Sequence, residues 1–103
     1  MTASLKTSLT VNGKAVELNE YAHNYLTNIV VCAVSMLKGY EEINSLTFTF
    51  EGDKATLTIN GKPIPLVRYP RVALIGTFKG TVSSLKDTGN IETMEIEIRD
   101  SKP

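Results

Sequence analysis

Two stretches of the chain alternate hydrophobic and polar residues with a period of two. One runs from Leu46 to Phe50, and the other runs from Thr93 to Arg99. Alternation of this kind buries one face of a strand and leaves the other in water, which is typical of an antiparallel sheet covered on one side. The segment Glu51-Gly52-Asp53-Lys54 can turn the first strand into another, so we expect a three-stranded meander over 45–66.

Two further segments carry the pattern of a β-hairpin. In each, an Asn-Gly pair, Asn12-Gly13 or Asn60-Gly61, separates two short runs of alternating residues. A two-residue type I′ turn needs positive φ at both central positions, which Asn and Gly tolerate best. Pro63 and Pro65 lack backbone N–H groups, so the second arm of the second hairpin is expected at a sheet edge.

Two helices are predicted, over about Asn19 to Lys38 and Tyr69 to Lys86. Asn19 is a suitable N-cap for the first, and Pro70 fits the first turn of the second. One narrow face of each helix gathers mainly apolar residues and should cover the sheet. These residues are Leu26, Val30, Ala33, Val34 and Leu37 in the first helix and Leu74, Phe78, Thr81, Val82 and Leu85 in the second.

The two halves of the chain resemble each other. When 9–52 is moved forward by 48 positions without a gap, it lies over 57–100 with thirteen of 44 pairs identical. Chance would give roughly two or three identities, which indicates an internal duplication. A half of about 48 residues is near the size at which a chain no longer folds alone, so the halves are expected to share one core.

These patterns together predict an α+β protein with the order ββαβ-ββαβ. We expect a two-layer sandwich with about six mainly antiparallel strands and with two helices on one face. No linker rich in Pro, Ser or Gly separates the halves. The chain is therefore expected to be a single domain, 1–103, built from two repeats at about 9–52 and 57–100.

The sides of the two helices that face away from the predicted core differ strongly. The first helix carries a bulky stripe of Tyr21, Tyr25, Cys32 and Met36, where the second carries Tyr69, Ala73, Gly80 and Ser84, with Gly76 one turn from Gly80. Each glycine costs the helix about 1 kcal/mol relative to alanine, so a packing contact should offset it. We expect the bulky stripe to pack against the glycines within one chain; the alternative is contact with another subunit.

Composition and charge exclude several classes of protein. Eleven Lys and Arg residues balance eleven Asp and Glu residues, so the chain lacks the excess positive charge typical of binding to nucleic acid or anionic membranes. The longest apolar run, Ile29 to Val34, is far shorter than the roughly 18 residues of a membrane span. The polar start and the single cysteine favour a cytoplasmic protein.

The residues with chemical potential do not form a recognisable catalytic pattern. His23 and Cys32 would lie about 13.5 Å apart along one helix and on opposite sides of it. We expect Cys32 to be a small buried residue and His23 to be solvated. No phosphate-binding loop, dinucleotide motif, zinc-ligand spacing or triad is present. The sequence therefore predicts no enzyme and gives no catalytic, cofactor-binding or metal-binding residue.

The segment Leu9-Thr-Val-Asn-Gly-Lys-Ala-Val-Glu-Leu18, followed by a helix, resembles the start of the small ubiquitin-like sulfur carrier proteins. The resemblance covers about ten residues and implies the hairpin-then-helix order of the β-grasp fold. Those carriers act through a C-terminal Gly-Gly, whereas this sequence ends in Arg99-Asp-Ser-Lys-Pro103. The resemblance thus extends to topology and not to activity.

The expected function is association with a protein partner. We expect a small non-enzymatic interaction or structural module that pairs with itself as a homodimer. The alternative is a small-molecule binding domain with its pocket between the helices and the sheet, near Tyr25, Asn28 and Gly76.

Overall fold

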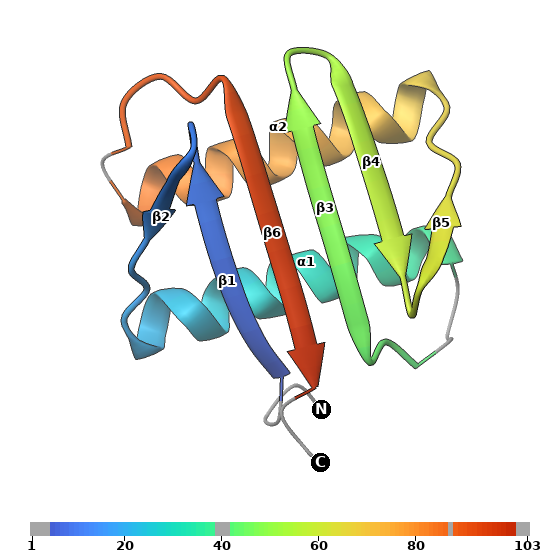
Figure 1. Ribbon diagram of the computed structural model, residues 1–103, viewed down its shortest axis with the longest axis horizontal. Helices are drawn as coiled ribbons and strands as arrows, with labels where there is room; N and C mark the ends of the chain where they lie inside the picture. Colours follow the sequence, from blue (N-terminus) through green and yellow to red (C-terminus); the bar gives the residue numbers. More distant parts are fainter. Residues whose placement is uncertain (1–4, 39–41, 87, 101–103) are drawn as a thin grey trace.

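The computed structural model describes residues 5–38, 42–86 and 88–100. Its elements follow the order β1 (Leu5–Val11), β2 (Lys14–Val16), α1 (Glu20–Lys38), β3 (Ser45–Glu51), β4 (Lys54–Ile59), β5 (Lys62–Ile64), α2 (Arg68–Leu85) and β6 (Thr93–Asp100). The fold is α+β, with a six-stranded antiparallel sheet and two helices, as the sequence pattern predicts. Both helices lie on the same side of the sheet and run in opposite directions (Figure 1).

The strand order is β2-β1-β6-β3-β4-β5, and every neighbouring pair is antiparallel. The meander β3-β4-β5 is confirmed, and β5, which carries Pro63, is an edge strand as expected. The last strand, β6, enters the middle of the sheet between β1 and β3. Each hairpin therefore pairs with the strand that follows the helix of the other half.

The strand registers of the two halves differ by a constant offset of 48 residues. Leu9 lies opposite Ile96, and Leu57, which is 48 positions after Leu9, lies opposite Phe48. The hairpin registers obey the same offset in both of their strands. Between β3 and β6, Phe48 lies opposite Ile96, so a residue faces its own counterpart there. A two-fold axis through this pair relates the pairings of one half to those of the other.

The two predicted Asn-Gly turns form as expected. Asn12 and Asn60 have φ of 52° and 51°, and the glycines that follow them also have positive φ. The side chain of Asn12 additionally binds the segment before β6: its Oδ1 accepts hydrogen bonds from the N–H groups of Glu92 and Thr93, at 2.8 and 3.0 Å, and its Nδ2 donates to the Asn90 carbonyl at 2.8 Å. Each turn is thereby held to the start of a strand in the other half.

Asn60 makes the equivalent bonds 48 positions away. Its Oδ1 accepts from the N–H groups of Asn44 and Ser45, at 2.8 and 3.0 Å, and its Nδ2 donates to the carbonyl of Glu42 at 2.7 Å. We call these two sets of bonds the asparagine clamps. The sequence pattern shows why asparagine suits the turn, but not that its side chain joins the two halves.

The helices begin differently. Asn19 caps α1 as predicted, since its Oδ1 accepts a hydrogen bond from the N–H of Ala22 at 2.8 Å. The N-cap of α2 is Val67, which has no side-chain hydrogen bond to offer. Among the described residues, neither helix has the length and apolar character that a membrane-spanning helix requires.

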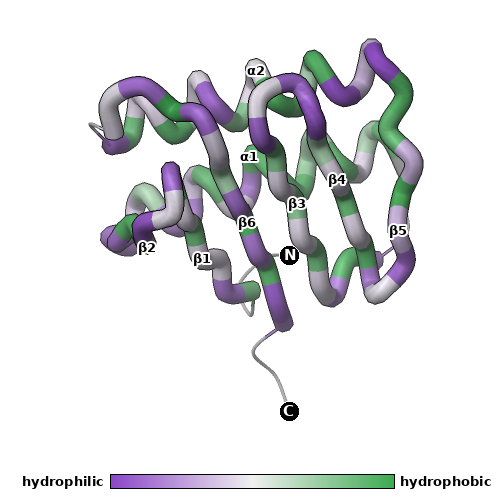
Figure 2. Tube along the Cα trace, turned by 45° about the horizontal axis from the view of Figure 1, so that its top comes forward, coloured by the Kyte–Doolittle hydropathy of each residue, from purple (hydrophilic) through white to green (hydrophobic). Residues whose placement is uncertain are grey.

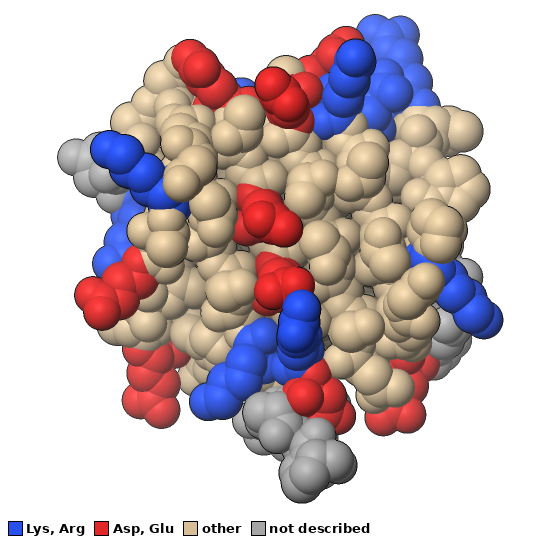
Figure 3. Space-filling model, viewed as in Figure 1, with Lys and Arg blue, Asp and Glu red and all other residues tan. Residues whose placement is uncertain are grey.

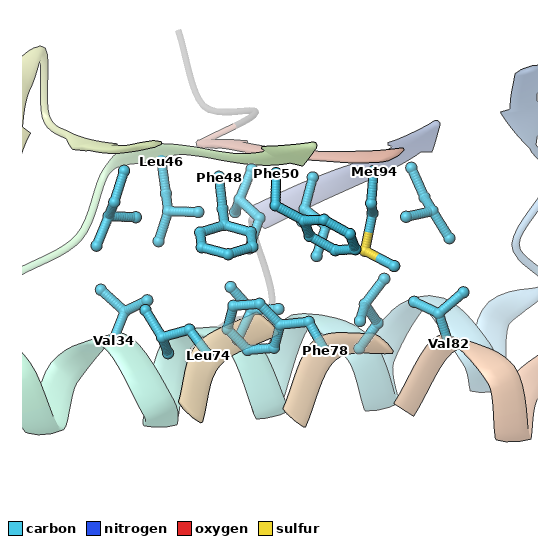
Figure 4. Packing of buried hydrophobic residues seen from close by; sticks show 14 of the residues in the cluster. Val34, Leu46, Phe48, Phe50, Leu74, Phe78, Val82 and Met94 are labelled. Carbon is cyan, nitrogen blue, oxygen red and sulfur yellow. The ribbon is translucent and has the colours of Figure 1, made fainter. Parts of the chain in front are cut away.

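The core lies between the sheet and the two helices. Hydrophobic and hydrophilic positions alternate along the strands (Figure 2), and the hydrophobic side chains meet those of the helices (Figure 4). The rings of Phe48 and Phe78 pack edge to face, with centroids 5.0 Å apart and planes at 87°. On the helices, the buried residues are Ala22, Leu26, Thr27, Val30, Val34, Leu74, Phe78 and Val82.

The prediction for Leu37 is wrong, because its side chain is 41% exposed. It lies in the last turn of α1, at the side of the sheet that ends with the three-residue strand β5 (Figure 1). A helical wheel gives the direction of a side chain but not the extent of the sheet above it. Leu85, near the end of α2, is likewise only half-buried.

Candidate functional site

The large hydrophobic side chains that remain exposed gather on the helical layer. In the described part of the chain, each of them belongs to α1 or α2 or directly precedes α2. They are Tyr21, Tyr25, Met36, Leu37, Val67, Tyr69 and Val72. We call the side of the two helices that points away from the sheet the helical face. A concentration of apolar side chains on one face of a small protein is a mark of an interaction site.

On α1 the helical face is a raised stripe, which we call the α1 ridge: Tyr21, Tyr25, Cys32 and Met36. The rings of Tyr21 and Tyr25 touch, with centroids 5.9 Å apart. The side chains of Tyr21 and Met36 are 70% and 86% exposed. Aromatic and methionine side chains are enriched at the centres of protein interfaces.

The expected burial of Cys32 is wrong, since its side chain is exposed. Cys32 occupies the same side of α1 as Tyr21 and Tyr25, opposite the side that carries the buried Val30. Small size and moderate hydrophobicity favour burial of a cysteine on average, but the direction of the helix decides it here.

On α2 the helical face is low after the exposed Tyr69 and Val72 of its first turns, because small residues occupy it from there on. We call this stripe the α2 groove: Ala73, Gly76, Gly80 and Ser84. A β-carbon placed on Gly76 or Gly80 would meet no atom within 4 Å, apart from its immediate surroundings in the helix. The glycines therefore make no close contact inside the protomer.

The predicted contact between the ridge and the glycines within one chain is consequently wrong. The reason is geometric. Positions 48 apart on the two helices hold the same orientation relative to the sheet, because Val30 and its counterpart Phe78 both point into the core. The α1 ridge and the α2 groove occupy such matching positions, so both point away from the sheet and neither can face the other.

The two stripes of the helical face, the α1 ridge and the α2 groove, carry no charged residue. Between Tyr21 and Leu37 the sequence contains no Asp, Glu, Lys or Arg, and the α2 groove contains none either. Lys79 of α2 does not belong to the groove, since its Nζ lies 5.8 Å from the centre of the Phe50 ring in β3. A surface of this kind loses little charge hydration when it is covered.

The outer face of the sheet has the opposite character. Threonines from β1, β3 and β4 surround the carboxylates of β6, and Figure 3 shows acidic residues near the middle of this face. Thr49 and Thr56 are joined by a hydrogen bond of 2.6 Å, and Arg99 donates to Glu97 at 2.8 Å. A shallow hollow of about 370 Å³ lies over Thr10, Thr49 and Glu95. Two pairs of these polar groups bind each other, which is typical of a solvated sheet face.

His23 is half-buried, and the expectation of a solvated side chain is wrong. Its Nε2 accepts a hydrogen bond of 3.0 Å from the backbone N–H of Thr7 in β1. The other ring nitrogen, Nδ1, lies 3.0 Å from Oδ1 of Asn24, so it carries the hydrogen. Thr27, which is buried, donates to the His23 carbonyl at 2.6 Å and is hydrogen-bonded to the Thr7 hydroxyl. This cluster gives His23 a structural role.

The residues expected to line an internal ligand pocket do not converge. Tyr25, Asn28 and Gly76 are exposed on the outward sides of their helices, while the space between helices and sheet is filled by the core. A separate hollow of about 410 Å³ lies beside Arg68, Tyr69 and Val72 at the start of α2. In the described ranges, no three His, Cys, Asp or Glu side chains are grouped so that they could hold a metal ion.

No protein-family model matches the chain, and comparison with curated proteins and with solved structures found no significant similarity. The functional assignment therefore depends on the helical face itself. Its bulky stripe is visible in the sequence, but its exposure is not, because a helical wheel cannot distinguish a second packed face from a free one.

Proposed function

We propose that the protein is a small non-enzymatic association module that binds a protein partner, a second copy of itself, through the helical face. The observation that carries this proposal is the gathering of exposed large hydrophobic residues on the helical layer, where the α1 ridge and the α2 groove carry no charged residue. Burial of such side chains against a partner removes apolar area from water and is the main favourable contribution to association.

The size of the face suits a stable dimer. The protomer measures 33 × 32 × 19 Å, and the short dimension runs across the two layers (Figure 1). The helical side therefore offers an area on the order of 1,000 Å², whereas a standard protein interface buries roughly 800 Å² on each partner. Most of the helical face would have to be covered, which agrees with exposed apolar residues on both helices.

We further propose that the fold arose by duplication of a ββαβ unit. The constant offset of 48 residues in the strand registers and the matching asparagine clamps support this origin. Each hairpin is paired with the other half, as would follow if two ancestral copies had formed a dimer before their genes joined. Self-association would then be an old property of the unit.

A reducing compartment such as the cytoplasm is the proposed location. The single cysteine of the sequence, Cys32, is exposed on the helical face and has no second cysteine in its chain to pair with. Exposed unpaired thiols persist where glutathione and thioredoxin keep them reduced.

Charge introduced on the helical face tests the proposed function. Met36→Glu places a carboxylate on the exposed ridge, and we expect the dissociation constant for self-association to rise at least about tenfold because a buried unpaired charge is costly. The matched control is Thr56→Glu on the exposed outer face of β4, which should leave association unchanged. Light scattering after gel filtration measures both. Equal association of the two variants would place the interface elsewhere.

A further inference from the structure

We infer that the dimer is crossed, so that the α1 ridge of each protomer lies in the α2 groove of its partner. This inference rests on the proposed function and specifies the arrangement of the partner. The ridge and the groove lie side by side on one face. A second copy carries the same ridge and groove at the same distance from each other, so each ridge can meet the partner's groove at the same time. The partner is therefore a second copy of this chain, paired by a two-fold rotation.

Two arrangements would bring two helical faces together by a two-fold rotation with the helices stacked lengthwise on each other. Because α1 and α2 run side by side in opposite directions (Figure 1), an axis parallel to the helices stacks α1 on the partner's α2, and the reverse. An axis at right angles to the helices, in the plane of contact, stacks α1 on α1 and α2 on α2. The two arrangements place different side chains opposite each other.

Packing favours the crossed arrangement. When α1 lies on α1, the exposed side chains of Tyr21 and Met36 meet equally bulky groups, while the open spaces above Gly76 and Gly80 face each other and stay unfilled. The crossed arrangement fills each groove with a ridge. Protein interiors and interface cores are packed without such gaps, and small residues allow two helices to approach closely.

The absence of charge supports the same partner. Neither the ridge nor the groove carries an Asp, Glu, Lys or Arg side chain, so neither stripe offers a binding group for a charged partner. A second copy presents an equally neutral surface. The charged residues of β6 and of its neighbouring strands remain on the outer sides of the dimer, in water (Figure 3).

The fold also fixes which residues should meet. The two-fold axis of the strand registers passes through the pair Phe48 and Ile96, and the Phe78 ring packs on Phe48. Phe78 and its counterpart Val30 therefore lie near this axis, level with each other along the two helices. Cys32 lies two residues after Val30, and Gly76 lies two residues before Phe78. In antiparallel helices these two positions are level with each other.

A rotation about an axis parallel to the helices keeps each residue at its position along them. In the crossed dimer, Cys32 of one protomer therefore faces the partner's Gly76. Each α1 is stacked on the partner's α2, so the two Cys32 residues of the dimer lie in different stacks and do not approach each other. In the alternative arrangement, Cys32 approaches the partner's Cys32, and Gly76 approaches the partner's Gly76.

Disulfide trapping separates these arrangements, because two cysteines form a disulfide only when their α-carbons lie within about 7 Å. We expect mild oxidation of Gly76→Cys to convert the monomer band into a dimer band on a non-reducing gel. The native chain, with Cys32 alone, should stay a monomer on the gel. Adding Cys32→Ala to Gly76→Cys should abolish the dimer band, since it removes the partner thiol.

Ser84→Cys is the matched control, because it lies in the same groove but eight residues, about 12 Å, further along α2. It should form little crosslinked dimer. Equal trapping by Ser84→Cys, trapping of the native chain, or trapping of the Cys32→Ala/Gly76→Cys double variant would overturn the crossed arrangement. A dimeric solution mass with any of these results leaves the proposed function standing, whereas a monomeric mass overturns both.

Discussion

Phe48 on β3 lies directly opposite Ile96 on β6, and these two residues are counterparts 48 positions apart. A residue can face its own counterpart only on a symmetry axis. The two-fold axis that relates the strand pairings of the two halves therefore passes through the centre of the sheet. Each half reaches across this centre, since β1 pairs with β6 and β4 pairs with β3. The halves are therefore interlocked in one sheet and do not form two separate units.

The asparagine clamps should stabilise this interlocking. Asn12→Gly keeps positive φ accessible but removes the three side-chain hydrogen bonds to Asn90, Glu92 and Thr93. We expect the free energy of unfolding in urea to fall by about 1–3 kcal/mol, given that each exposed bond contributes modestly.

The second clamp supplies a control for the first. Asn60→Gly should cost a similar amount, and the double variant should lose the sum because the two sites share no partner. A loss below about 0.5 kcal/mol for either single variant would mean that the clamps contribute little to stability.

The burial of the helix residues predicts a clear difference between two leucines of α1. Leu26 is fully covered, whereas Leu37 is 41% exposed. Leu26→Ala should lower the free energy of unfolding by roughly 2–5 kcal/mol, because it leaves a cavity in the core. Leu37→Ala should cost less than about 1 kcal/mol. Equal losses in urea unfolding would contradict the observed orientation of α1.

His23 should protect one particular backbone amide. His23→Ala removes the acceptor of the Thr7 N–H, which lies on the β2 side of β1 but beyond the residues that β2 pairs with, and should cost about 1 kcal/mol. Amide hydrogen exchange at Thr7 should accelerate in this variant. Asn24→Ala, which removes only the partner of the other ring nitrogen, should leave that amide protected. An unchanged exchange rate at Thr7 in His23→Ala would refute the structural role of His23.

Two glycines with equally open surroundings should respond to alanine in opposite ways. A β-carbon added at Gly80 or at Gly13 would have no neighbouring atom within 4 Å. Gly13, however, has a φ of 81°, which an alanine adopts only with strain. Measured on dilute monomer, Gly80→Ala should raise the free energy of unfolding by up to about 1 kcal/mol through helix propensity. Gly13→Ala should lower it by about 1–2 kcal/mol through backbone strain. A decrease for Gly80→Ala in the monomer would show that this glycine is packed after all.

Local patterns in the sequence predict the elements of this fold well. The alternation in 46–50 and 93–99, the turns at Asn12 and Asn60 and the cap at Asn19 each depend on a few neighbouring residues, and each is present as expected. The strand order is different, because it depends on contacts between residues far apart in the chain. Nothing near β6 indicates that it enters the sheet between β1 and β3.

The candidate site could be predicted only in part. Residue size alone predicts the difference between the α1 ridge and the α2 groove. The prediction that the two pack together within one chain is wrong because both have the same orientation relative to the sheet. The similarity of the two halves contains the information needed to reject that contact, because residues 48 apart are then expected to point the same way. His23 escaped prediction because its partner is a backbone N–H, which leaves no trace in the sequence.

Sedimentation equilibrium of the native protein over a range of concentrations tests self-association through the helical face most directly. One chain has a mass of 11.3 kDa. We predict that the native mass approaches twice this value as the concentration rises, while Met36→Glu needs at least about tenfold higher concentration to reach the same mass. A native mass of 11.3 kDa at all concentrations up to the millimolar range, where even weak dimers of Kd about 1 mM would be visible, would contradict the account.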